Sequence, residues 1–207
     1  MDITAYIYIV AAYLIGAIPF GLFFTKLFGG IDVRTVGSGN IGATNVLRAA
    51  GKKAAVLTLL ADGLKGFLPV YIAGRFFDDP VVQVAAGVTS FLGHLYPLYL
   101  SFRGGKGVAT GFGVSLGMAP WFGFICLLTW LGSAILWKYS SLAALIAFAA
   151  YPLMVFSLKP DDRAQQLLAL FLFAMIYYRH RENIKRLVNG EEPKIGQKKP
   201  VTGSTTV

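Results

Sequence analysis

Long uncharged apolar runs constrain this chain more than any other feature of its sequence. The longest run, 107–137, contains no charged residue. Further apolar runs of about the length of a span lie at roughly 3–25, 54–74, 81–100, 139–158 and 164–178. A helix needs about 20 apolar residues to cross a bilayer, and backbone inside lipid must satisfy its own hydrogen bonds. The sequence therefore predicts an all-α integral membrane protein.

Composition supports this class and argues against several kinds of site. The chain is 56% hydrophobic and 14% charged, whereas soluble domains carry about 25% charge. The lone cysteine, Cys126, allows no intrachain disulfide, and two histidines are too few for a three-histidine metal site. We expect no metal, no cofactor and no nucleic-acid partner, and the sequence does not indicate an oligomeric state. The first run lacks a basic n-region, so we expect it to be retained as a span.

The number of spans depends on the run 107–137, which Pro120 divides. It is either one long tilted helix or two helices, 107–119 and 120–137, of which the first could instead be re-entrant. Seven spans with the N-terminus outside place fifteen of the 19 Lys and Arg residues in the cytoplasm: Lys26, Arg34, Arg48, Lys52, Lys53, Arg103, Lys106, Lys138, Arg179, Arg181, Lys185, Arg186, Lys194, Lys198 and Lys199. Six spans would leave nine on each side. The positive-inside rule therefore predicts a bundle of seven transmembrane helices with a cytoplasmic C-terminus.

These boundaries give one transmembrane catalytic domain over 1–192. The polar tail 193–207 is expected to be disordered. In this topology three polar segments reach the cytoplasmic face: 37–53, 101–110 and 177–192. We predict that they converge there on one site.

The first two segments are suited to binding an anion. In GGKG (104–107), glycines let backbone N–H groups approach a phosphate and Lys106 adds a cation, although the segment is not a Walker A loop. The alternative is a flexible basic loop. GSGN (37–40) predicts a tight turn, after which Thr44 or Asn45 could cap a short interfacial helix through Arg48. Arg48 is either a headgroup anchor or a bidentate phosphate ligand.

The remaining candidates have both a structural and a functional interpretation. His180 and Asn183 are three residues apart and share a helix face, and His180 is either an interfacial donor or a proton acceptor. Asp62 and Lys65 lie one turn apart within a span. They form a structural pair or lend charge to the site. For His94 a packed, hydrogen-bonded histidine is the simpler interpretation.

Together these motifs resemble a known family. GSGNIGATNVLR, GHLYPLYLSFRGGKGVAT and RHRENIKRLVNGEE, in this order, resemble the three cytoplasmic motifs of the bacterial acyl-phosphate:glycerol-3-phosphate acyltransferases (PlsY), and DGLKGFLPV resembles that family's second span. The resemblance implies functional roles for Ser38, Arg48, Lys106, His180 and Asn183, and a structural role for an acidic residue, Glu191. It also implies binding of glycerol phosphate by Gly104, Gly105 and Gly107. We add Gly39, Asn40, Thr44, Asn45 and Thr110 as phosphate-binding candidates, and Asp62, Lys65 and His94 as supporting residues.

The function implied is acyl transfer from acyl phosphate to the 1-hydroxyl of sn-glycerol 3-phosphate. The products would be lysophosphatidic acid and phosphate, in the first step of bacterial phospholipid synthesis. The enzyme would lie among the lipids of the inner membrane with its active site on the cytoplasmic side. His180 or a substrate phosphate could take the proton, with a slight preference for the phosphate, and a covalent Ser38 intermediate is least favoured. The alternative from another class is a small phosphate or organic-anion transporter, which would also place charges within spans.

Overall fold

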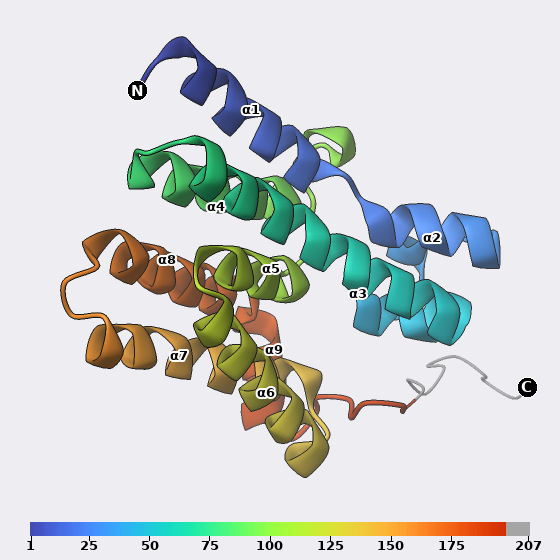
Figure 1. Cartoon of the computed structure of the whole chain (residues 1–207). Helices are drawn as coiled ribbons and strands as arrows, with labels where there is room; N and C mark the ends of the chain where they lie inside the picture. The colour runs from blue at the N-terminus through green and yellow to red at the C-terminus, as the bar shows by residue number, and fades with distance from the viewer. Residues whose placement is uncertain (198–207) are drawn as a thin grey trace, which may run out of the picture.

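The computed structural model describes residues 1–197, in which the regular elements are helices (Figure 1). Its helices are α1 (Ile3–Ala17), α2 (Phe20–Gly29), α3 (Ala43–Phe76), α4 (Pro80–Leu95), α5 (Val108–Met118), α6 (Pro120–Trp137), α7 (Ser140–Leu158), α8 (Arg163–Arg179) and α9 (Arg181–Val188), with 3-10 turns at Val33–Thr35 and Leu98–Leu100. Five stretches are long and apolar enough to cross a membrane: Ile3–Gly29, Ala43–Phe76, Pro80–Leu100, Pro120–Trp137 and Ser140–Leu158. The predicted class, an all-α membrane protein, is confirmed.

The predicted tail lies only partly within the described residues. In 193–197 the Ile195 N–H donates to the Lys138 carbonyl oxygen at 2.7 Å. The rest of the predicted tail, 198–207, lies outside the described residues.

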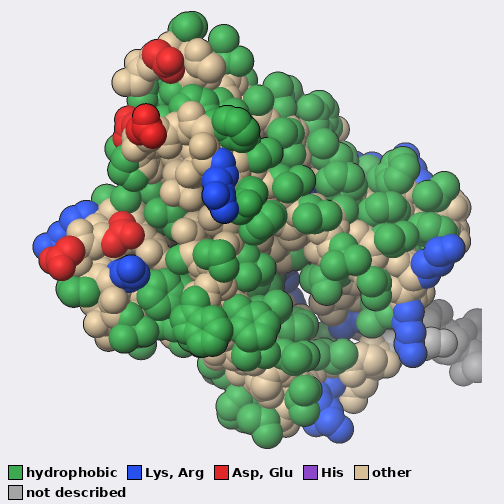
Figure 2. Space-filling model, viewed as in Figure 1, with side chains coloured by type: hydrophobic (Ala, Val, Ile, Leu, Met, Phe, Trp, Pro, Cys, Tyr) green, Lys and Arg blue, Asp and Glu red, His purple; other side chains and the backbone are tan. Residues whose placement is uncertain are grey.

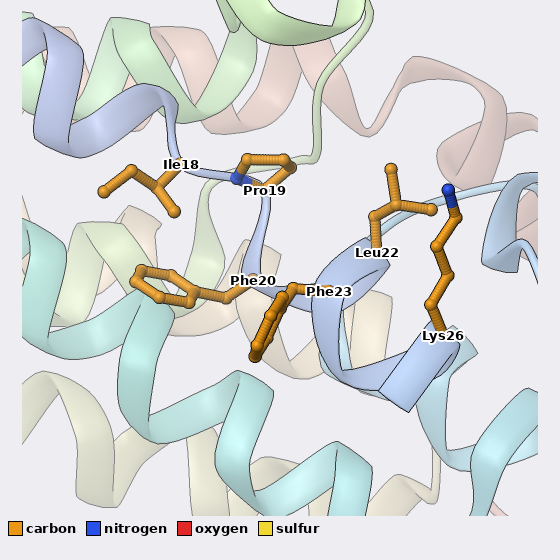
Figure 3. A pocket seen from close by; sticks show the side chains of 6 residues that line it. All are labelled: Ile18, Pro19, Phe20, Leu22, Phe23 and Lys26. Carbon is orange, nitrogen blue, oxygen red and sulfur yellow. The ribbon is translucent and has the colours of Figure 1, made fainter. Parts of the chain in front are cut away.

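The first predicted span is divided into two helices. The sequence predicts one helix over 3–25, but α1 ends at Ala17 and α2 begins at Phe20. Pro19 has no N–H to donate to the preceding turn, and Ile18 takes an extended conformation with ψ 120°. The uninterrupted helix is therefore a wrong prediction. Beside the break is an open apolar hollow of about 410 Å³, with Lys26 on its wall (Figure 3).

α3 contains both the expected interfacial helix and the second span. The two parts meet at Gly51, whose φ of 81° and ψ of −176° lie in a region that is essentially restricted to glycine. The predicted cap is wrong, because Gly42 is the N-cap and no side chain bonds there. Asn45 is turned back into the preceding loop, and the Thr44 hydroxyl lies 3.2 Å from that of Ser140.

Small residues allow the closest helix contacts. α1 meets α4 where a Cβ at Gly16 would lie 2.0 Å from the Ser90 carbonyl oxygen, and α5 meets α3 where a Cβ at Gly113 would lie 2.0 Å from that of Gly63. Transmembrane helices commonly pack through such residues. Large apolar side chains cover much of the outer surface, as lipid contact requires (Figure 2).

The two ends of the bundle differ in charge. The N-terminus and the α3–α4 and α7–α8 connections lie at the left of Figure 1, and the α2–α3 loop lies toward the right. On the face shown in Figure 2, the acidic side chains gather at the left end, whereas the right end shows Lys and Arg without acidic neighbours. The loops that carry the polar motifs thus lie toward the more basic end.

Candidate active site

The loop before α3 is built around the side chain of Asn45. Its Nδ2 donates to the carbonyl oxygens of Val33, Val36 and Asn40 at 2.9–3.0 Å, and its Oδ1 accepts from the Ser38 N–H at 3.0 Å. The side chain is buried. Asn45, predicted to bind phosphate, therefore uses its hydrogen-bonding groups to shape the loop. Asn40 also helps to shape it, since its Oδ1 accepts from the Gly42 N–H at 2.9 Å.

This loop presents Ser38 at the surface, close to Arg48. Gly37 and Gly39 flank the exposed serine with φ of 61° and 69°, so both take the left-handed conformation that favours glycine. A Cβ at Gly37 would lie 2.3 Å from Asn45 Oδ1 and 3.9 Å from Arg48 Cδ. The turn thus leaves Ser38 exposed, next to a glycine that packs near the Arg48 side chain.

The glycine-rich loop before α5 is held from two sides. The N–H groups of Gly104 and Gly105 donate to the carbonyl oxygens of Leu95 and His94, each at 3.1 Å. The Gly104 and Gly105 carbonyl oxygens accept from Arg179 at 2.9–3.1 Å. These bonds fix the loop immediately before Lys106, so the two N–H groups predicted to face a phosphate are already occupied by α4.

Lys106 joins the second polar segment to the third. Its Nζ donates to Asn183 Oδ1, and Asn183 Nδ2 donates to Glu192 Oε1 at 2.6 Å. Glu192 also accepts from the Ser141 hydroxyl and from Arg186 Nε, both at 2.7 Å. Two predicted site residues, 77 positions apart, are therefore in direct contact.

The supporting carboxylate is Glu192 rather than Glu191. Glu191 is exposed, and its backbone N–H donates to the Arg186 carbonyl oxygen at 2.7 Å. This turn directs the next side chain, that of Glu192, back toward α7 and α9. Burial acts to raise the pKa of Glu192, but hydrogen bonds from Ser141, Asn183 and Arg186 outweigh it and hold that pKa below its usual value.

His180 lies buried at the junction of α8 and α9. Its Nδ1 is 2.8 Å from the Ile176 carbonyl oxygen, which can only accept, so Nδ1 carries the proton and Nε2 is left as an acceptor. Burial, and then the charge of Lys106, lower the pKa of His180 to about 4. The imidazole is therefore neutral near pH 7 and is a weak base.

Lys106 is surrounded by other cations. Burial lowers its pKa to about 8; Glu192 acts in the opposite direction, and the charges of Arg186, Arg179 and Arg48 lower it further. An anion among these four groups would have a strong electrostatic attraction to them. The arrangement is suited to holding phosphate groups.

An open, polar hollow of about 550 Å³ lies beside this cluster. Gly39 and Gly104 line it together with Arg34, Arg103 and Arg179. Arg34 is paired with Asp32 at 2.6 Å within the same wall. The hollow brings residues of all three polar segments to one cationic surface.

Two candidates of the second segment lie at the start of α5. Gly107 is the N-cap of that helix, with φ 85°, and a Cβ there would lie 2.5 Å from the Phe91 ring. Thr110 is fully buried against α3, where a Cβ at Gly66 would lie 2.3 Å from the Thr110 carbonyl oxygen. The structure thus places Thr110 in a helix contact and not with Lys106.

The charged residues of the second span form a buried cluster with His94. Lys65 Nζ lies 2.7 Å from Asp62 Oδ1, and His94 Nδ1 lies 3.7 Å from the same oxygen. All three side chains are buried. Asp62 and Lys65 are therefore paired, as the structural interpretation of these charges predicted.

Comparison with known proteins agrees with this arrangement. Residues 6–190 match the family model for glycerol-3-phosphate acyltransferase. The chain belongs to this family.

Curated relatives of this acyltransferase family cover nearly the whole chain. The chain is 52% identical over 190 residues to the glycerol-3-phosphate acyltransferase of Methylorubrum populi, covering 92% of each sequence. It is 50% identical over 200 residues to that of Caulobacter vibrioides, covering 96% of this chain and 91% of the relative. The resemblance to the acyltransferase motifs is thereby confirmed.

Solved structures of the family are similar in fold. The crystal structure of PlsY, an integral membrane glycerol 3-phosphate acyltransferase, in its glycerol 3-phosphate form matches with a TM-score of 0.88 and 44% identity, covering 93% of this chain and 96% of that one. Its lysophosphatidic acid form matches with a TM-score of 0.85 and 42% identity. These matches overturn the transporter alternative, because the similarity extends over nearly the entire chain to an acyltransferase.

Sequence reasoning did not assign four polar residues of the acyltransferase cluster to the site. Arg103 enters only the count of charges for topology, and Arg179 enters that count and a helix stripe with Asn183 and Arg186. The acidic role falls to Glu191 rather than Glu192, and Ser141 is not assigned. Arg103 stands directly before GGKG, so its position in the motif was a usable signal. Ser141 gave no such signal, because it begins an apolar helix far from the motifs in sequence.

Proposed function

We propose that this chain transfers a fatty acyl group from acyl phosphate to the 1-hydroxyl of sn-glycerol 3-phosphate. The contact between Lys106 and Asn183 carries the proposal, because it joins two motif segments beside a hollow lined by arginines. Both substrates carry phosphate, which such a surface attracts. The apolar hollow near Pro19 and the lipid-facing helices offer surface for a fatty chain.

In the reaction, the 1-hydroxyl oxygen bonds to the acyl carbon and the bond from that carbon to the phosphate oxygen breaks. The products are lysophosphatidic acid and inorganic phosphate. The leaving group of a mixed anhydride needs little acid help, so the main task is to stabilise negative charge with fixed donors. Ser38, Arg48 and Lys106 are suited to this role.

The hydroxyl proton goes to a phosphate oxygen of the bound substrate. A pKa of about 4 makes His180 a weak base near neutral pH, which favours this route over general-base catalysis by the imidazole. His180 Nε2 then serves as a hydrogen-bond acceptor. A covalent intermediate on Ser38 would first convert the anhydride into a less reactive serine ester with release of phosphate, which brings no clear advantage to an already activated donor.

The proposed topology has seven spans, with the N-terminus outside and the active site at the cytoplasmic face of the bacterial inner membrane. Residues 1–192 form one catalytic domain. The short α5 and the 17-residue α8 complete the count beside the five longer stretches. The basic character of the motif-bearing end supports this orientation.

The proposal is tested with purified protein in lipid, radiolabelled glycerol 3-phosphate, and palmitoyl phosphate or palmitoyl-CoA as donor. We expect lysophosphatidic acid only from the acyl phosphate. Lys106→Met should reduce kcat/KM by roughly 100-fold or more, because a cation at the phosphates is lost. Lys52→Met, which removes an exposed lysine, is the matched control and should be active. Equal use of palmitoyl-CoA, or full activity of Lys106→Met, would contradict the proposal.

A further inference from the structure

His94 packs against the glycine-rich loop that precedes Lys106 and bonds to it. The Gly105 N–H donates to the His94 carbonyl oxygen at 3.1 Å, and the Gly105 backbone lies directly against the ring, since a Cβ there would be 2.1 Å from His94 Nε2. A Cβ at Gly104 would be 2.1 Å from the His94 carbonyl oxygen. Both glycines therefore pack against His94, which lies in the last turn of α4, one residue before the helix ends at Leu95.

Charged groups of a neighbouring helix lie next to the His94 ring. Asp62 Oδ1 lies 3.7 Å from His94 Nδ1 and 2.7 Å from Lys65 Nζ. Lys65 also donates to the Ile18 carbonyl oxygen at 2.7 Å, at the point where Pro19 ends α1. The cluster thus joins α1, α3 and α4 beneath the glycine loop.

Fold stability alone gives little reason for such a cluster. Removing two charges from water is costly, and a well-packed apolar pair of similar volume is often as stable. Charges within spans are accordingly associated with function. Here the cluster lies directly behind the loop whose next residue, Lys106, is in contact with Asn183.

We propose that His94 is a positioning residue for acyl transfer. Arg179 donates to the carbonyl oxygens of the same loop. Together with Arg179, the His94 ring fixes the position of the Gly105 backbone and therefore the position of Lys106 relative to phosphate. Asp62, paired with Lys65, lies on the Nδ1 side of the ring. The inference rests on the proposed function, and it assigns to the buried cluster a role in binding glycerol 3-phosphate.

The test uses the contact between the ring and Gly105. Gly105→Ala forces a Cβ into the ring, and His94→Ala removes the support, so each should raise KM for glycerol 3-phosphate roughly tenfold or more with a smaller change in kcat. In the double variant the smaller residue at 94 leaves room for the added Cβ. We therefore expect its KM and its Tm to lie closer to wild type than those of Gly105→Ala.

Two further variants complete the design. Ser90→Ala alters a buried residue one turn earlier in α4, whose hydroxyl donates to the Gly87 carbonyl oxygen at 3.2 Å, and should leave KM unchanged. His94→Asn keeps a polar group toward Asp62 while shortening the side chain. If His94→Ala does not fold, His94→Asn replaces it in the double variant with Gly105→Ala.

A double variant with no recovery of KM over Gly105→Ala would overturn the inference, as would a wild-type KM in folded His94→Ala. The comparison of Tm values needs no activity. If the wild-type protein formed no lysophosphatidic acid, the proposed function would fail, and the Tm values would still show whether the ring and Gly105 are coupled.

Discussion

The charge of Lys106 depends on its surroundings. Burial, with Arg186, Arg179 and Arg48 nearby, holds its pKa at about 8, against an unperturbed value of about 10.4. A lysine is cationic below its pKa, so lowering that pKa moves the loss of charge to a lower pH. The Lys106 ammonium that would contact phosphate therefore loses its proton at a lower pH than an ordinary lysine does.

The pH dependence of kcat/KM should reveal this. Above pH 7 the substrate phosphate is already largely ionised, its second pKa being about 6. We expect kcat/KM for glycerol 3-phosphate to fall as pH rises through about 8, because free enzyme with neutral Lys106 binds the dianion poorly. Lys106→Arg should be less active at pH 7 but keep its activity to higher pH, since a guanidinium does not lose its proton there. A wild-type profile that is flat to pH 10 would contradict the assignment.

At the scale of the element, one bend divides α3 into a part that belongs to the site and a part that belongs to the bundle. Its first part carries Arg48 close to the turn at Gly37, and its second part carries Asp62 and Lys65 into the bundle. Gly51 lies between them with φ 81°, and no atom lies within 4 Å of the position that a Cβ would take. The requirement for glycine here comes from the backbone conformation alone, and not from crowding.

Gly51→Ala should therefore cost about 1–3 kcal/mol in stability, or straighten the helix and move Arg48. Thermal unfolding in detergent and KM for both substrates are the measurements. The control is Gly132→Ala in α6, a helical glycine with equally open surroundings, which should leave stability unchanged or raise it by up to about 1 kcal/mol. If the two variants had the same stability and kinetics, the bend would not constrain the site.

At the scale of the whole molecule, the orientation in the membrane decides which solution the site faces. Single cysteines are placed at four exposed positions in a Cys126→Ala background: Asp78 and Asp161 in the α3–α4 and α7–α8 connections, Lys52 in α3 and Glu182 in α9. With seven spans and the N-terminus outside, a membrane-impermeant maleimide should label positions 78 and 161 in intact spheroplasts, and positions 52 and 182 only after permeabilisation. Labelling of 182 together with 78 would indicate six spans instead.

The sequence by itself determined the helical class and most helix positions. A backbone inside lipid has no water to bond, so long apolar runs become helices whatever their neighbours are. Pro120 marks the start of α6, and the three polar segments contain Lys106, Asn183 and His180. These predictions depend on local composition and on motifs, both of which can be read along the chain.

Only the tertiary structure decided which polar groups pair. Asn45 shapes its own loop, Glu192 replaces Glu191, and Arg179 holds the glycine loop. Which side chain points into the site depends on the backbone conformation of the turn before it. A shift of one residue along the chain would point the neighbouring side chain inward instead. Likewise, Lys65 caps the Ile18 carbonyl oxygen only because α1 and α3 pack together. A motif gives the kinds of group at a site, but the geometry of packed helices decides which of them meet.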